Sequence, residues 1–237
     1  MFYQQQIITS IGNAPDGMQK NATISAVLEF VENYLPEFAL EYKYIENEKG
    51  LNHYLVLNLA GKAIIKKCIF RFQHENMENP ERGDSPFNDF AVYSNSENVY
   101  EVEGITYKKD EPFFVFECKI LGLKEKLREK EYLIGHIKNK KYILCGGIER
   151  YKQEIHGAKL PKAGLIGYVK EKDFETWYKQ LNNWIEGFAS DVSDNWTASD
   201  KLIMQKSNEI IALLTSENSR ILNNKPIFLY HLWVNLL

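Results

Sequence analysis

The sequence predicts a single α/β domain in which a mixed β-sheet is flanked by helices. Three observations predict this class. Segments with helical periodicity alternate along the chain with short apolar runs typical of strands, which is the pattern of an α/β sandwich. Hydrophobic residues make up 44% and aromatic residues 13% of the chain, which is ample material for a core. The length of 237 residues suits one large domain, assigned to residues 1–237.

The N-terminal part is expected to supply one helix and two strands. Apolar residues recur at helical spacing over residues 23–35, and Pro36 is expected to end that helix. The first twenty residues are expected to form a strand or a loose arm. The runs 54–59 and 63–72 are strand-like and are joined by a predicted turn at Gly61.

The middle of the chain carries the two strands on which the functional argument depends. A polar loop rich in turn-forming residues spans 75–86 and leads into a predicted strand at 89–93. The strongly apolar run 113–118 predicts a buried strand. The charged stretch 124–145 is expected to be a helix that continues, after two glycines, through 148–155.

The C-terminal part is expected to add two helices and two strands. The run of small and apolar residues at 163–169 predicts a buried strand, and the aromatic-rich stretch 173–189 predicts a helix. A second helix is expected at 199–214. The apolar run 226–236 predicts a further strand of the sheet.

The most informative segment is FFVFECKIL, residues 113–121. Alternation along a strand places Glu117 and Lys119 on one face and Cys118 on the other. A buried charge is costly unless it is paired or binds a metal. Asp89, at the start of the preceding strand, is placed to supply a second carboxylate beside Glu117.

These three side chains predict a catalytic metal centre. Mg²⁺ prefers oxygen ligands and usually takes one or two carboxylates, which Asp89 and Glu117 would supply. A bound metal lowers the pKa of a water molecule and polarises a phosphoryl oxygen. Lys119 would orient or deprotonate the attacking water, or stabilise charge on the phosphate.

An Asp followed by Glu-x-Lys on the next apolar strand resembles the PD-(D/E)XK superfamily of restriction-endonuclease-like nucleases. Asn88–Asp89 stands for the PD element and Glu117–Cys118–Lys119 for the (D/E)XK element. The resemblance implies a restriction-endonuclease-like mixed β-sheet flanked by helices, with a catalytic core at about 23–170. Extra helices and a strand would form a C-terminal extension at about 171–237. It also implies a Mg²⁺- or Mn²⁺-dependent nuclease that hydrolyses DNA phosphodiester bonds, in restriction or anti-phage defence.

The resemblance extends through the rest of the chain. GGIERYKQEIHG (146–157), KAGLIGYV (162–169) and IFLYHLWVNL (227–236) resemble segments of an uncharacterised bacterial branch of that superfamily. The chain departs from the branch at Ile120, where an Arg often follows the catalytic Lys. It departs again after Arg150–Tyr151, where the branch often has a Gly and a Tyr. These departures affect the phosphate contacts and not the metal centre.

Further residues are candidates for the same site. Arg150 is a candidate to bind a backbone phosphate, although an exposed helix Arg needs no function. Glu75 is a candidate to bind the metal or to hold a metal ligand in place. The first helix of the superfamily often contributes another Glu. Glu29 and Glu32 are candidates for that role, but both lie off the apolar stripe of the predicted helix.

Structural interpretations of the same residues remain open. Glu117 and Lys119 are also read as an ordinary cross-strand pair on a solvated face, and Asp89 as the cap of a turn. The formal net charge of −3 gives no overall attraction to nucleic acid, so a DNA-binding face must be local, with the basic segment 138–141 as a candidate. The charge favours the alternative function, a catalytically inactive restriction-endonuclease-like subunit acting in binding or assembly. A metal-dependent hydrolase of another phosphate ester is a third interpretation.

The cysteines and the N-terminus bear on compartment and partners. Cys68, Cys118 and Cys145 show no CxxC spacing and are expected to be reduced, with none binding zinc. The N-terminus lacks the basic and apolar regions of a signal peptide, and no apolar run approaches the ~20 residues of a membrane span. A cytoplasmic protein that binds DNA and no membrane is therefore expected, with a homodimer left open.

Overall fold

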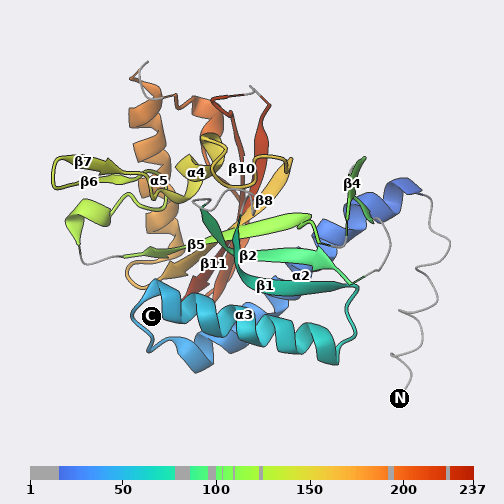
Figure 1. The fold of residues 1–237 in the computed structure, drawn as a ribbon. Helices are drawn as coiled ribbons and strands as arrows, with labels where there is room; N and C mark the ends of the chain where they lie inside the picture. The colour runs from blue at the N-terminus through green and yellow to red at the C-terminus, as the bar shows by residue number, and fades with distance from the viewer. Residues whose placement is uncertain are drawn as a thin grey trace.

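The fold is a three-layer sandwich, in which a seven-stranded mixed sheet has helices on both faces (Figure 1). This confirms the predicted mixed α/β class with a sheet flanked by helices. No helix in the part of the chain described here is long and apolar enough to cross a membrane. The computed structural model describes residues 16–77, 86–95, 100–102, 104–108, 110–122, 125–191, 195–222 and 225–237.

The sheet has a parallel centre and antiparallel flanks. Its strands, in spatial order, are β1 (Phe70–Met77), β2 (Phe87–Ser94), β5 (Phe114–Leu121), β8 (Lys162–Val169), β11 (Ile227–Asn235), β10 (Ile211–Asn218) and β9 (Ile203–Ser207). The neighbours β5, β8 and β11 run parallel, and the other pairs are antiparallel. Two small hairpins stand apart from this sheet: β3 (Tyr100–Val102) with β4 (Ile105–Tyr107), and β6 (His136–Lys138) with β7 (Lys141–Ile143).

The helices α2 (Asp16–Tyr42) and α3 (Glu48–Ile65) cover one face of the sheet (Figure 1). Tyr168 of β8 points to this side, where its hydroxyl donates to Asn52 of α3 at 2.9 Å and its ring contacts Phe38 of α2. The helix α3 buries one stripe at helical spacing, formed by Leu51, Leu55, Leu59 and Ala63. Burial of this stripe removes apolar surface from water and fixes α3 against the sheet.

The helices α4 (Gly147–Lys152) and α5 (Phe174–Ala189) cover the opposite face. Gly167 of β8 makes room there for Trp233 of β11, since a Cβ on Gly167 would lie 2.4 Å from the Trp233 ring. Phe174 of α5 packs against the same ring. Glu117 and Lys119 of β5 pair with Leu165 and Gly167 of β8, so their side chains lie on this face too.

Two predictions for the N-terminal part were wrong. The helix predicted at 23–35 is confirmed, but it does not stop at Pro36, which lies inside α2. The strand predicted at 54–59 and the turn at Gly61 are both part of α3. The apolar residues of this segment fit a helical stripe as well as an alternation. Gly61 needs no turn, because a Cβ there would meet no atom within 4 Å.

The predicted strand 63–72 was right only in its last three residues, where β1 begins at Phe70, because α3 extends to Ile65. The strand β1 also occupies the start of the predicted loop 75–86. Of that loop, residues 78–85 lie outside the described residues. Residues 1–15 of the predicted strand or arm also lie outside them, and residues 16–20 belong to α2, so the prediction was wrong for that part.

The two helices predicted at 124–145 and 199–214 were also wrong. The first segment contains a short 3-10 turn at Lys126–Arg128 and the β6–β7 hairpin. The charged residues of this segment are not accompanied by an apolar stripe that a helix could bury. Asn139 and Lys140 instead adopt the positive φ angles that a tight hairpin turn requires. The second segment forms β9 and β10, and side chains of β10 alternate between buried and partly exposed positions.

Candidate functional site

Asp89 and Glu117 lie on neighbouring strands and face the same side of the sheet. In the β2–β5 pair, Phe90 lies opposite Phe116, and the two rings stack with centroids 4.4 Å apart. Because side chains alternate along a strand, the preceding Asp89 and the following Glu117 both point to the other face. The backbone amide of Cys118 donates to Asp89 Oδ2 at 2.6 Å, which ties Asp89 to β5.

Lys119 lies beside Glu117 and is almost fully buried. Its Nζ is 2.9 Å from Glu117 Oε1, and the side chains are 6% and 1% exposed, respectively. A buried ammonium and a buried carboxylate at this distance compensate each other for much of the solvation that both have lost. The structure thus makes this pair part of the interior and not a cross-strand pair on a solvated face.

Glu48, the first residue of α3, approaches the same amine from the helical layer. Its Oε1 lies 3.2 Å from Lys119 Nζ, and its Oε2 accepts from the backbone amide of Ile120 at 3.3 Å. The helix start is fixed by Asn47, whose side chain accepts from the Gly50 amide. The positive end of the helix dipole favours a carboxylate at this position.

The sequence interpretation missed Glu48 because it read this helix as a strand. An Asn followed by an acidic residue and an apolar run is a helix-start pattern, and it was present in the sequence at Asn47–Glu48.

Arg150 and His156 complete the surroundings of Glu117. Arg150 of α4 places NH1 2.8 Å from Glu117 Oε1, and His156, after α4, places Nδ1 3.0 Å from Oε2. Arg150 is 24% exposed, whereas His156 is fully buried. Arg150 was a predicted site residue, whereas no pattern in the sequence indicated His156.

The surroundings of Asp89 and Glu117 shift the pKa values of these two carboxylates in opposite directions. Burial and the nearby charge of Glu117 raise the pKa of Asp89 well above its ordinary value, although Lys119 acts in the other direction. Burial acts to raise the pKa of Glu117 as well, but Lys119, His156 and Arg150 outweigh burial and lower it. Burial acts to lower the pKa of Lys119, and Glu117, Glu48 and Asp89 together raise it well above its ordinary value. Glu117 and Lys119 are therefore an ion pair at neutral pH, while Asp89 binds its proton more tightly than usual.

The remaining acceptor positions determine whether a cation fits. A carboxylate offers about four lone-pair positions. Lys119 and Arg150 both contact Oε1 of Glu117, whereas Oε2 lies 3.0 Å from His156 Nδ1 without the geometry of a hydrogen bond. Partly buried Asp89 uses one position for the Cys118 amide. Both residues therefore keep acceptor positions for a hard divalent cation, which needs only one or two protein carboxylates when its other ligands are water. Glu48 is not part of a three-carboxylate group with them, since the ligand oxygens of the three do not all lie within 4.8 Å of one another.

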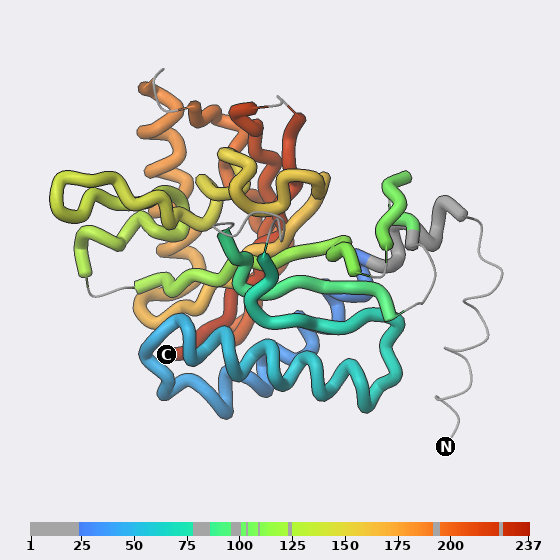
Figure 2. The backbone as a smooth tube through the Cα atoms, in the orientation of Figure 1, coloured from blue at the N-terminus to red at the C-terminus, as the bar shows by residue number. Residues whose placement is uncertain are grey.

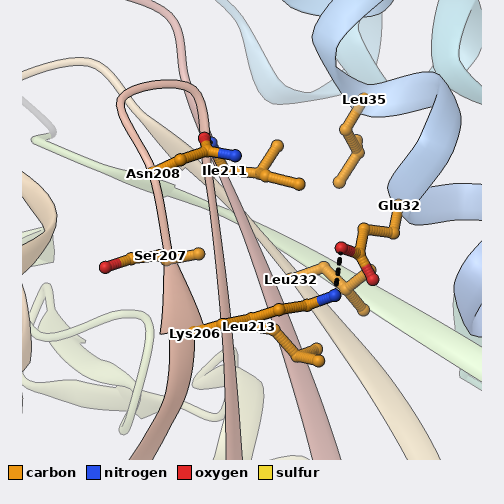
Figure 3. Close-up of a pocket in the computed structure, with 9 residues that line it drawn as sticks. Glu32, Leu35, Lys206, Ser207, Asn208, Ile211, Leu213 and Leu232 are labelled. Carbon is orange, nitrogen blue, oxygen red and sulfur yellow. Dashed lines mark hydrogen bonds and ion pairs between the residues drawn. The ribbon is translucent and has the colours of Figure 1, made fainter.

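Three other predicted candidates lie outside this cluster. Glu75 is exposed at an irregular position of β1, with a positive φ angle, and Glu29 is exposed on α2. Glu32 forms an ion pair with Lys206 of β9 at 2.6 Å, beside a cavity of about 70 Å³ (Figure 3). That cavity is lined by residues of α2, β9, β10 and β11 and shares no residue with the cluster around Glu117.

Comparison with known proteins does not assign the chain to a family. No protein-family profile, curated protein or solved structure matches the chain. A function is therefore inferred from the residues of the site and from the resemblance of its motifs.

Proposed function

We propose that this chain is a metal-dependent nuclease that hydrolyses DNA phosphodiester bonds with Asp89, Glu117 and Lys119. The observation that carries the proposal is the meeting of two carboxylates and an amine on one face of β2 and β5. The Lys119 amine lies 2.9 Å from Glu117, and Asp89 is hydrogen-bonded to the strand that carries both. The mixed sheet flanked by helices is compatible with the restriction-endonuclease-like fold that the PD-(D/E)XK resemblance implies.

In this proposal, Asp89 and Glu117 hold Mg²⁺ or Mn²⁺, the hard cations that suit carboxylate ligands. When bound, the ion supplies Lewis acidity and lowers the pKa of a water molecule. Glu48 stands at the start of α3, whereas the Glu that the resemblance implies was expected on the first helix, at Glu29 or Glu32. Glu48 contacts Lys119, so its role is to position the amine.

The surroundings of Lys119 favour one of its two candidate roles. Its raised pKa keeps the amine protonated at neutral pH, and an ammonium has donors but no acceptor. A protonated amine does not remove a proton from water, but it stabilises negative charge that develops on a phosphate. The proposed role of Lys119 is therefore electrostatic stabilisation in the transition state.

Arg150 and the β6–β7 hairpin are the proposed phosphate contacts. Arg150 is partly exposed and bound to Glu117 through one nitrogen, which leaves guanidinium donors for a phosphate oxygen. The hairpin carries exposed Lys138, Lys140 and Lys141, and it projects from the sheet (Figure 2). A net charge of −3 requires such local basic groups for any DNA contact.

The proposal is tested by cleavage of plasmid and single-stranded DNA with Mg²⁺ or Mn²⁺. Lys119→Met retains the apolar stem and removes the charge, so it should abolish cleavage and leave metal binding by calorimetry largely intact. Lys179→Ala is the matched control, because Lys179 forms only an exposed helix pair with Glu175 and should retain wild-type cleavage. Wild-type cleavage by Lys119→Met would refute the mechanism.

Glu117 needs a conservative variant. Glu117→Ala would leave Lys119 and Arg150 without their buried counter-charge, which costs about 3–5 kcal/mol in comparable buried pairs. Glu117→Gln keeps the acceptor oxygen and is expected to lose both metal binding and cleavage, since a neutral amide is a poorer ligand for a hard cation than a carboxylate. Melting temperature without metal should be measured alongside, to separate this effect from unfolding.

A catalytically inactive subunit is the second candidate, and one observation favours it. Oε1 of Glu117 is already paired with the cations of Lys119 and Arg150, which compete with a metal for this oxygen. An active centre should gain melting temperature with Mg²⁺ or Mn²⁺, because ligand binding to the native state stabilises it. A wild-type protein that neither gains stability from these ions nor cuts nucleic acid would favour the inactive subunit.

A further inference from the structure

A second group of potential metal ligands lies at the base of the β6–β7 hairpin. Glu131 precedes the hairpin, His136 begins β6, and Cys145 follows β7. Cys145 Sγ lies 2.9 Å from Glu131 Oε1 and 3.3 Å from His136 Nδ1. The distance between His136 Nδ1 and Glu131 Oε1 is 3.8 Å. Three different ligand types thus point to one position.

These distances fit a tetrahedral zinc site. Bond lengths of about 2.3 Å to sulfur, 2.0–2.1 Å to nitrogen and 2.0–2.2 Å to oxygen place tetrahedral ligand atoms about 3.4–3.6 Å apart. The observed separations of 3.3 and 3.8 Å lie within a few tenths of an ångström of this range, and the 2.9 Å between Cys145 Sγ and Glu131 Oε1 lies about 0.5 Å below it. Small side-chain adjustments would therefore place all three atoms around one ion.

The group is also held in place from outside. Arg128 donates to Glu131 Oε2 at 2.7 Å, so the other carboxylate oxygen faces the thiol and the imidazole. Glu131 is 4% exposed, and Cys145 and His136 are partly buried. An outer partner that fixes the orientation of a ligand is a regular feature of metal sites.

We infer that Glu131, His136 and Cys145 bind a zinc ion. Thiolate and imidazole select zinc or a similar transition metal over Mg²⁺, which prefers oxygen ligands alone. A Zn²⁺ ion with one thiolate and one carboxylate is a neutral group, which suits a partly buried position. The part of the chain that the structure describes supplies three ligands here, so the fourth position is open to water or another ligand. Because the cysteines lack CxxC spacing, the sequence predicted that Cys145 does not bind zinc, and the inferred site reverses that expectation.

The position of the site suggests what the ion does. The β6–β7 hairpin pairs with no strand of the main sheet, and an isolated two-stranded hairpin is only marginally stable. Zinc would join the residues on either side of the hairpin, and so fix its basic tip relative to α4, which begins two residues after Cys145. The metal site does not depend on the proposed nuclease activity, but a role for it in DNA contact rests on that proposed function.

The test uses full-length protein freed of metal with a chelator and titrated with Zn²⁺ or, separately, Mg²⁺. We expect a single zinc ion per chain at this site, with a rise in melting temperature that Mg²⁺ does not reproduce here. Co²⁺ substituted for zinc should show the absorption of a thiolate bound to the metal. Cys145→Ser should lose that absorption and weaken zinc binding by more than the roughly 10–100-fold expected for loss of an outer partner.

Two controls separate this site from others. Cys68→Ser removes another partly buried thiol, and Asp89→Asn alters the proposed nuclease centre, and both should retain zinc binding. Absence of zinc binding by wild type would overturn the inference, as would an unchanged cobalt spectrum in Cys145→Ser. Loss of zinc binding in Asp89→Asn but not in Cys145→Ser would also overturn it. None of these outcomes depends on whether the protein cleaves DNA.

Discussion

Single residues explain how charge is tolerated at the centre of this fold. Glu117 is almost fully buried, but Lys119, Arg150 and His156 surround its two oxygens within 3.0 Å. Asp89, on the neighbouring strand, has a backbone amide as its hydrogen-bond donor and lies near the charge of Glu117. The pKa values of the two carboxylates are therefore shifted in opposite directions, although both lie on one face of the sheet.

Asp89→Asn is predicted to stabilise the metal-free protein, and more so as the pH rises. The pKa of Asp89 is raised on folding above its unfolded value of about 3.9. The stability that this proton contributes is present below that value and is lost as the pH rises through the folded pKa. Asn keeps an acceptor for the Cys118 amide without the charge.

Melting temperatures of both proteins from pH 5 to 8 in chelator test this prediction. The difference in melting temperature between Asp89→Asn and wild type should grow steadily from pH 5 to pH 8. A difference that does not change with pH would show that Asp89 does not titrate in this way. With Mg²⁺ present, the order should reverse if Asp89 is a ligand.

At the scale of secondary-structure elements, the strands approach so closely that side chains of one fill space left by glycines of the next. A Cβ on Gly164 of β8 would lie 2.2 Å from the ring of Phe116 on β5. Phe116 is buried and stacks on Phe90, so it has little freedom to move away.

Gly164→Ala is predicted to destabilise the protein by at least about 1–3 kcal/mol, the usual cost of overpacking a core. Gly187→Ala is the matched control, since Gly187 lies within α5 with no atom within 4 Å of an added Cβ. That change should stabilise the protein by about 0.5–1 kcal/mol, the helix preference for Ala over Gly. Denaturant unfolding measures both values, and equal effects would contradict the packing argument.

A buried ion pair joins α4 to the turn before β9. Lys152 Nζ lies 2.8 Å from Asp200 Oδ2, with exposed fractions of 2% and 0%. Asp200→Ala would leave the Lys152 ammonium buried over the Trp196 ring without a counter-charge, so a loss of about 3–5 kcal/mol is predicted. Lys201→Ala removes a solvent-exposed pair with Glu186 and should cost at most about 1 kcal/mol. Similar losses for the two variants in chemical denaturation would count against this account.

Local pattern predicted some elements and not others. The strands at 113–118 and 163–169 and the helix at 173–189 were confirmed, because each has a single periodicity and clear boundaries. The wrong helix at 124–145 was assigned from charge alone. Its actual hairpin is fixed by close backbone contact, since a Cβ on Gly135 would lie 2.0 Å from the Ile143 carbonyl oxygen. Such a contact is not visible in composition.

The same limit applies to the candidate site. The alternation of β5 and its motif sufficed to select Glu117, Lys119 and, with the preceding strand, Asp89. Glu48 lies 71 positions before Lys119, and His156 lies 39 positions after Glu117. They reach the site through the packing of α3 and of the turn after α4, respectively. Tertiary packing brings them there, and the sequence pattern alone did not predict it.

At the scale of the whole molecule, the described C-terminal strands belong to the same sheet as the rest and form no separate unit. The sequence interpretation placed an extension at about 171–237, but β11 lies at the centre of the same sheet, between β8 and β10. Trp233 of β11 is fully buried and donates to the Tyr132 hydroxyl at 2.8 Å. Residues on both sides of the proposed boundary therefore share one core.

A fragment ending near residue 170 is predicted not to fold, although it contains the whole proposed catalytic cluster. It would lose the parallel partner of β8 and the Trp233 side of the core. Circular dichroism and hydrogen exchange should show an unfolded or aggregated fragment, with full-length protein as the control. A fragment with cooperative thermal unfolding would contradict this prediction.

The central position of β11 also has a consequence during synthesis on the ribosome. The strands β1, β2, β5 and β8 leave the ribosome first, and the outer edge of β8 stays unpaired until residue 235 has followed. At about 5–20 residues per second, that interval lasts several seconds. An open edge of a buried, apolar strand is a template for pairing between nascent chains. Slower elongation after residue 169 should therefore lower the soluble yield, and coexpressed chaperones that shield nascent chains should restore it.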